Sequence, residues 1–159
     1  MNTFKKMVAA LLVLSSTAAP VAAFAQSPVS LSGDVKAVET TVDDAGNEVT
    51  KLVDPDVIVP GDRLVFGTDY ANNGAEPVEN FVVTNPLPAA VRLAPDADPQ
   101  LVVSVDAGKS WGVLASLTVA GEDGSTRAAS HADVTHVRWT LPVIAPGESG
   151  RLEYPAIIR

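Results

Sequence analysis

The stretch RLVFGTDYAN, from Arg63 to Asn72, decides the fold class of this 159-residue chain. Its side chains alternate with a period of two, which is the spacing at which a β-strand turns one set toward a core and the other toward solvent. Turn formers flank it, with VPGD at 59–62 before it and NNG at 72–74 after it. The expected inward set is Leu64, Phe66, Thr68 and Tyr70, and the expected outward set is Arg63, Val65, Gly67 and Asp69.

Similar short alternations recur between turn-forming clusters along the chain, which is typical of an all-β sandwich or barrel. The DDAGN turn at 43–47 joins the first two strands into an extra N-terminal hairpin. The PLP segment at 86–88 cannot sit in a central ladder, so we expect the chain to change sheets there. The prediction is an antiparallel β-sandwich with strands at 29–42, 48–53, 63–72, 78–84, 90–93, 101–105, 113–119, 134–141 and 150–158, and a polar loop at 121–130.

The first 25 residues have the layout of a secretory signal peptide. Lys5 and Lys6 form a basic start, an apolar run follows from Met7, and an A-x-A motif ends at Ala25. Ser, Thr and Pro interrupt the run early, whereas a spanning helix needs about 20 predominantly apolar residues. We therefore expect cleavage before Gln26, export to the periplasm, the exterior or the cell surface, and no stable membrane anchor afterwards.

Composition limits the partners of the processed chain. Removing Lys5 and Lys6 leaves nine basic against 19 acidic residues, a formal charge of −10. A surface of that sign repels phosphate backbones and anionic lipid, so nucleic acid is not expected as a partner. The chain has no cysteine, which excludes disulfides, thiolate catalysis and Cys-ligated metals.

Three segments together carry a resemblance to a known family. They are VPGDRLVFGTDYANNGAEPVENFVVTNPLP at 59–88 and VRWTLPVIAPGESGRLEYPAIIR at 137–159, with a Trp-containing segment between them. In order and spacing they resemble the bacterial exported, cell-surface repeat known as domain of unknown function family eleven. The resemblance implies an immunoglobulin-like sandwich, usually in tandem and with no known activity. It covers residues 56–159 as the domain, leaving 26–55 as a strand and hairpin extension; this chain departs from the family in carrying one copy and no visible anchor.

The segment SVDAGKSW, from Ser104 to Trp111, matches the S-x-D-x-G-x-x-W pattern of sialidase-like propellers. Asp106 can accept turn amides, Gly108 permits positive φ, and Trp111 can fold back on apolar neighbours. One copy favours a structural turn over a glycosidase. We assign turn roles also to Pro60, Gly61 and Asp62, and to Pro146 and Gly147.

Candidate chemistry is otherwise sparse, and we expect no enzyme activity. The two histidines, His131 and His136, lack a third soft ligand for zinc and are expected to face solvent. No G-x-S-x-G elbow occurs, and the carboxylates fall mostly in turns. Weak calcium binding stays open as the one cofactor, at Asp43, Asp44, Asn47 and Glu48 or at Asp96 and Asp98, although neither group has EF-hand spacing.

Two functions remain. The first is a non-catalytic structural or interaction module that contacts envelope proteins or its own copies through sheet edges. Residues 29–42 could pair in cis or be donated to a neighbour, with cis pairing favoured because connections usually stay local. The alternative is binding of a small ligand or polysaccharide. It is disfavoured because the mature chain's aromatic residues mostly occupy inward-type positions, leaving few for a surface platform; they are Phe66, Tyr70, Phe81, Trp111, Trp139 and Tyr154.

Overall fold

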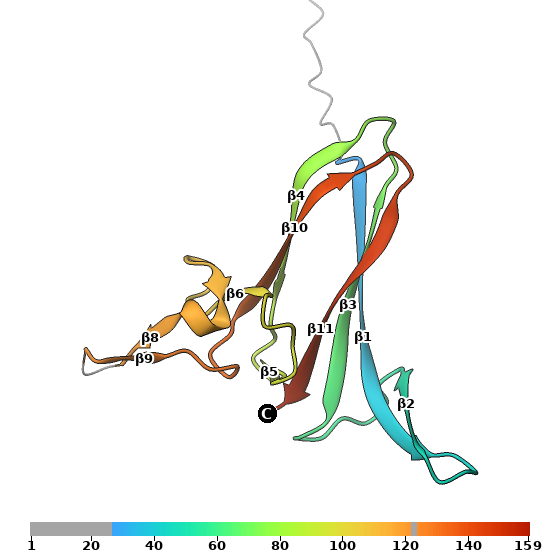
Figure 1. The fold of residues 1–159 in the computed structure, drawn as a ribbon, viewed down its shortest axis with the longest axis vertical. Coiled ribbons are helices and arrows are strands. Elements are labelled where there is room, and N and C mark those ends of the chain that lie inside the picture. Colours follow the sequence, from blue (N-terminus) through green and yellow to red (C-terminus); the bar gives the residue numbers. More distant parts are fainter. Residues whose placement is uncertain (1–26, 122–123) are drawn as a thin grey trace, which may run out of the picture.

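The computed structural model describes residues 27–121 and 124–159, which form antiparallel sheets (Figure 1). The expected signal peptide, residues 1–25, lies outside the described residues. The larger sheet has five strands in the order β2 (Glu48–Val53), β1 (Val29–Val42), β3 (Arg63–Asn72), β11 (Ser149–Ile158) and β5 (Val91–Leu93). Strand β1 pairs with β2 and β3 of its own chain, so its backbone is satisfied in cis.

The second sheet has four strands in the order β4 (Val78–Pro86), β10 (His136–Ile144), β6 (Val102–Ser104) and β7 (Gly112–Val113). The chain leaves this sheet after β4 and enters the larger sheet at β5, which confirms the change of sheets expected at the two prolines. The structure thus has the two-layered, all-β architecture that the alternation predicts.

Two expected segments differ in detail. The strand expected at 113–119 is interrupted by a single 3-10 turn, η1 (Leu114–Ser116). The expected polar loop at 121–130 contains strand β9 (Thr126–Ala128), which pairs with β8 (Thr118–Ala120) as a separate two-stranded ribbon. Both errors concern strands of two or three residues, which are too short for alternation to be visible.

The core lies between the two sheets and is built from the inward sets of β3, β10 and β11. Tyr154 is 1% exposed and stacks on Phe66 with ring centroids 5.0 Å apart. Trp139 reaches Tyr154 from the facing sheet at 6.2 Å. The sheets are also joined by a hydrogen bond from Asn85 Nδ2 to Thr68 Oγ1, 2.7 Å long, which places β4 opposite β3.

Strand β11 carries Pro155, for which an edge position or a bulge is expected. β11 instead lies inside its sheet, between β3 and β5. The Pro155 carbonyl accepts from Ala94 N at 3.0 Å, so this residue turns its hydrogen-bonding side away from β3 and toward the β5 side. The missing N–H therefore lies on the β5 side opposite Ala94, whose carbonyl accepts from Ala97 N instead, and no β3 ladder bond is lost.

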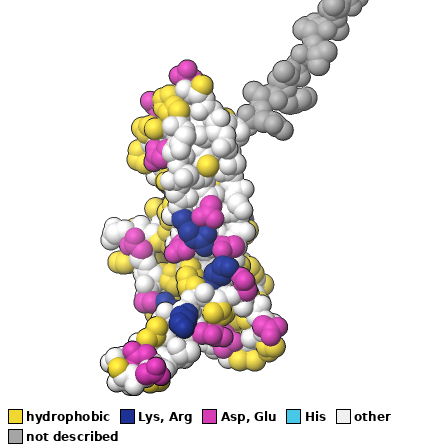
Figure 2. All heavy atoms as spheres, turned by 90° about the vertical axis from the view of Figure 1, so that its right-hand side faces the viewer, with side chains coloured by type: hydrophobic (Ala, Val, Ile, Leu, Met, Phe, Trp, Pro, Cys, Tyr) yellow, Lys and Arg dark blue, Asp and Glu magenta, His cyan; other side chains and the backbone are white. Residues whose placement is uncertain are grey.

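The outer face of the larger sheet carries an ion-pair network in which basic side chains lie beside acidic ones (Figure 2). Arg151 on β11 contacts Glu153, Asp34 on β1 and Asp69 on β3. Its guanidinium crosses β3 directly above Gly67, where a Cβ would overlap it. The three carboxylates raise the pKa of Arg151 above its usual range.

The β1–β2 hairpin extends beyond the sandwich. Pairing of β1 with β3 ends at Ala37, and from there to Val42 only β2 pairs with it. Residues 38–53, called the hairpin arm below, project from the lower end of the sheet (Figure 1).

Candidate functional site

The SVDAGKSW segment forms the turn between β6 and β7, and the Asp106 carboxylate lies at its centre. Asp106 Oδ1 accepts from Ser104 Oγ at 2.7 Å, Lys109 N at 3.0 Å and Ser110 N at 2.9 Å. Oδ2 accepts from Ser110 Oγ at 2.6 Å. These hydrogen bonds, those from Ser110 first, hold the pKa of Asp106 well below its usual range.

Gly108 and Trp111 complete the same turn. Gly108 has φ +85°, a left-handed conformation that side chains disfavour. Its N–H donates to Ser104 Oγ at 2.9 Å, and its carbonyl accepts from Trp111 Nε1 at 3.0 Å. The side chains of Ser104, Asp106, Ser110 and Trp111 thus all hydrogen-bond within the turn, as a structural turn requires.

Trp111 packs on the outside of the sandwich, and this corrects two expectations. Arg138 lies over the Trp111 ring at 3.6 Å from its centroid, and the His136 ring meets it edge-on at 6.2 Å. Both partners belong to the outward set of β10, because their neighbour Val137 is fully buried. Trp111 is therefore not inward-facing, and His136 is half-buried beneath it rather than facing solvent.

The other sequence-predicted turns lie at opposite ends of β11. Asp62 Oδ2 accepts from Val59 N at 2.8 Å, and Gly61, with φ +98°, donates to the Ile158 carbonyl at 3.0 Å. At the far end Gly147, with φ +75°, follows Pro146 and donates to the Asn72 carbonyl at 2.9 Å. The hydrogen bonds of each turn fix the chain locally, and the two turns lie apart in the fold.

The two acidic groups considered for calcium contain carboxylates that hydrogen-bond to the backbone of their own turns. Asp43 accepts from Ala45 N at 2.9 Å and from Asn47 N at 2.8 Å, and the Asn47 bonds lower its pKa. Asp98 accepts from Gln100 N at 2.8 Å, while Asp96 pairs with Arg63. Within residues 27–121 and 124–159, no three His, Cys, Asp or Glu side chains are grouped so that they could hold a metal ion.

The hairpin arm and the loop that follows it, residues 54–59, together carry the clearest concentration of exposed apolar side chains. Leu52 on β2 is 50% exposed, and Val57 in the following loop is 79% exposed. Val57 lines a shallow hollow together with Val38, and Val38 pairs across the ladder with Leu52. We define the arm surface as Val42, Leu52, Val57, Ile58 and Val59, all of them exposed.

Strand β2 is the edge of its sheet, with no partner on its outer side among the described residues. The Asn47 carbonyl accepts from Asp43 N, so odd-numbered residues of this hairpin strand direct their backbone groups toward β1. Glu48, Thr50 and Leu52 consequently direct their N–H and C=O groups outward. Another edge strand, β4, contains Asn80 at φ +51° near its start and ends at Pro86, features that interrupt an edge available for pairing.

The surroundings of the arm surface are acidic. Residues 36–59 contain six acidic and two basic side chains, a net charge of −4. One of the two lysines, Lys36, is held by Asp54 at 2.5 Å, and this bond raises its pKa. Acidic and apolar side chains lie together at the lower end of the molecule in Figure 2.

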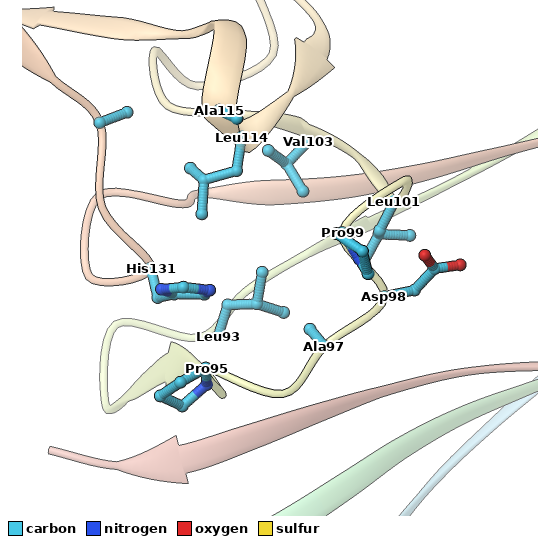
Figure 3. Close-up of a pocket in the computed structure, with 11 residues that line it drawn as sticks. Leu93, Pro95, Ala97, Asp98, Pro99, Leu101, Val103, Leu114, Ala115 and His131 are labelled. Atoms are coloured by element: carbon cyan, nitrogen blue, oxygen red, sulfur yellow. The ribbon is translucent and has the colours of Figure 1, made fainter.

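A separate apolar pocket of about 370 Å³ opens beside the β5–β6 loop (Figure 3). Its walls come from that loop, from η1 and from the segment before β10. His131 lines it and is half-buried. The residues at its centre include Leu93, Leu101, Val103, Leu114 and His131. Sequence reasoning missed this pocket because its walls are far apart along the chain.

Comparison with known protein families, with curated proteins and with solved structures finds no match to this chain. Within residues 27–121 and 124–159, no helix has the length and hydropathy of a membrane span.

Proposed function

We propose that this chain is an exported, non-catalytic interaction module of the cell envelope or cell surface, in an immunoglobulin-like sandwich, and that it binds an extended, positively charged segment of another protein along β2. The observation that carries the proposal is the combination found along residues 36–59, the hairpin arm and its flanks: a free strand edge, exposed apolar side chains and a local charge of −4.

Each part of this combination recognises a different property of the partner. The outward N–H and C=O groups of Glu48, Thr50 and Leu52 pair with the backbone of an added strand, as in known cases of β-strand addition. Leu52, which is 50% exposed on the edge strand, supplies apolar contact to the added strand. The acidic surroundings select basic side chains and speed encounter.

The binding experiment uses residues 26–159 and two synthetic peptides, acetyl-(Lys-Val)4-amide and acetyl-(Glu-Val)4-amide. We expect the cationic peptide alone to bind, with amide shifts concentrated on β2 and with affinity that falls as salt is added. Equal binding of both peptides, or no binding of either, contradicts the proposed charge selection.

A matched pair of variants locates the surface. Leu52→Ser removes an arm side chain that is 50% exposed, and Val143→Ser removes one that is 53% exposed on β10. We expect the first to weaken cationic-peptide binding about fivefold or more and the second to leave it unchanged. Loss of binding in Val143→Ser instead would place the interaction on the other sheet.

Export is tested separately from binding. We expect the secreted protein to begin at Gln26 when its N-terminus is sequenced, because the A-x-A motif ends at Ala25. An N-terminus at Met1 in a cell-retained protein would contradict the proposal of export while leaving peptide binding to be judged on its own.

A further inference from the structure

We infer that the apolar pocket beside the β5–β6 loop binds a small, uncharged ligand with an apolar body and one hydrogen-bonding head group, which lies against His131. This site is distinct from the hairpin arm and does not depend on it. Its volume, about 370 Å³, lies at the small end of the range of ligand pockets.

The floor of the pocket belongs to the hydrophobic core itself. Leu93, Leu101 and Val103 line it, and all three are buried members of the core cluster. A ligand here would extend the core, and binding would gain a free energy of about 25 cal/mol for each Å² of apolar surface removed from water. An apolar body is therefore the chemical requirement that the floor imposes.

The pocket is held open by a braced loop. Ala94 N donates to the Pro155 carbonyl at 3.0 Å, and Ala97 N donates to the Ala94 carbonyl at 3.1 Å. Leu101 N donates to the Asp98 carbonyl at 3.0 Å, and Pro95 restricts the same loop. Since these contacts order the walls before a ligand arrives, little ordering free energy remains to oppose binding.

His131 supplies the polar contact. Figure 3 shows its ring extending into the space between Leu114 and Leu93, while the Asp98 carboxylate points away from that space. No residue in the described part of the chain hydrogen-bonds to the His131 ring, so a ring nitrogen is available to a ligand hydroxyl or amide. Asp98, by contrast, already accepts from Gln100 N.

The charge of the surroundings excludes an anionic head group. The pocket walls contain no Lys or Arg, the carboxylate at the rim is that of Asp98, and the whole chain has a formal charge of −8. Moving a carboxylate from water into such a pocket carries a desolvation cost without a cationic partner. A neutral alcohol or amide meets both the apolar floor and the single imidazole.

The test uses benzyl alcohol and toluene as probes, followed by amide chemical shifts of residues 26–159. We expect saturable shifts confined to the pocket with both probes. His131→Leu should weaken benzyl alcohol roughly three- to tenfold, the effect of one hydrogen bond, and leave toluene binding nearly unchanged. Equal weakening of both probes, or none, would overturn the assignment to His131.

A plugging variant tests the pocket independently. Ala115 is exposed at the rim, so Ala115→Trp can cover the opening without disturbing the core. Ala120→Trp is the matched control, on an exposed alanine of β8 that does not line the pocket. We expect only Ala115→Trp to abolish both probes' shifts while melting like the parent. Shifts that persist in Ala115→Trp, or that scatter over the surface, would overturn the inference, whatever the cationic peptide does.

Discussion

Gly108→Val is the substitution whose effect follows most directly from the turn geometry. Gly108 has φ +85°, and a left-handed backbone costs an L-residue roughly 1–2 kcal/mol, toward the upper end for a β-branched one. A Cβ at this position meets Trp111 Cζ2 at 3.5 Å, an ordinary contact, so Gly108→Ala isolates the backbone cost alone. We expect a loss of about 1 kcal/mol for Ala and about 2 kcal/mol for Val.

Thermal unfolding followed by circular dichroism measures this cost. A loss of about 2 kcal/mol corresponds to a Tm lowered by roughly 5–10 °C in a domain of this size. Gly46→Val is the control, because Gly46 has the same φ of +85° with no neighbour within 4 Å of a Cβ. The arm that carries Gly46 can fray without opening the core, so its shift should be smaller. An unchanged Tm for Gly108→Val, or a larger shift for Gly46→Val, would refute the coupling of the turn to the core.

Four further predictions concern the core, the pH dependence of stability and calcium. Tyr154→Ala should cost about 3–5 kcal/mol in denaturant unfolding because the ring is fully buried against Phe66, whereas Tyr154→Phe should change little. Burial raises the pKa of Tyr154 to about 12, so the stability conferred by its neutral form is complete below pH 10 and is lost as the pH rises through 12; alkaline melts of Tyr154→Phe should lack this contribution. The Arg127 guanidinium and Ser130 hold the pKa of Asp133 below its usual range, so stability from this carboxylate is present above about pH 4 and lost as the pH falls; Asp133→Asn should flatten that acid limb in melts at a series of pH values. Addition of a chelator should leave the Tm unchanged, since the turn carboxylate of Asp43 is already hydrogen-bonded; a lowered Tm would restore calcium as a ligand.

Alternation and turn chemistry predict the long strands well. The stretch from Arg63 to Asn72 is a strand over that same range, and Leu64 and Thr68 of its inward set are buried. The DDAGN turn closes the β1–β2 hairpin, with Asp43 capping it as its side chain allows. These features are predicted correctly because residues close together in the sequence determine them.

The features that the sequence does not predict depend on contacts between distant parts of the chain. Period-two alternation correctly turns His136 outward, but it contains no information on Trp111, which arrives from the β6–β7 turn and covers it. The pocket likewise combines Leu93, Leu114 and His131 from three segments. The arm surface was missed for another reason: the sequence does not show where the facing sheet ends, so it does not tell which apolar side chains of residues 42–59 stay uncovered.

Amide hydrogen exchange along β2 tests the proposed strand addition most directly. In the free protein, the outward amides of Thr50 and Leu52 should exchange quickly, while the inward amides of Val49 and Lys51 are protected by β1. Saturating acetyl-(Lys-Val)4-amide should slow Thr50 and Leu52 and leave the inward pair unchanged. If the peptide binds while the outward amides keep exchanging at their free rate, no strand is added at this edge.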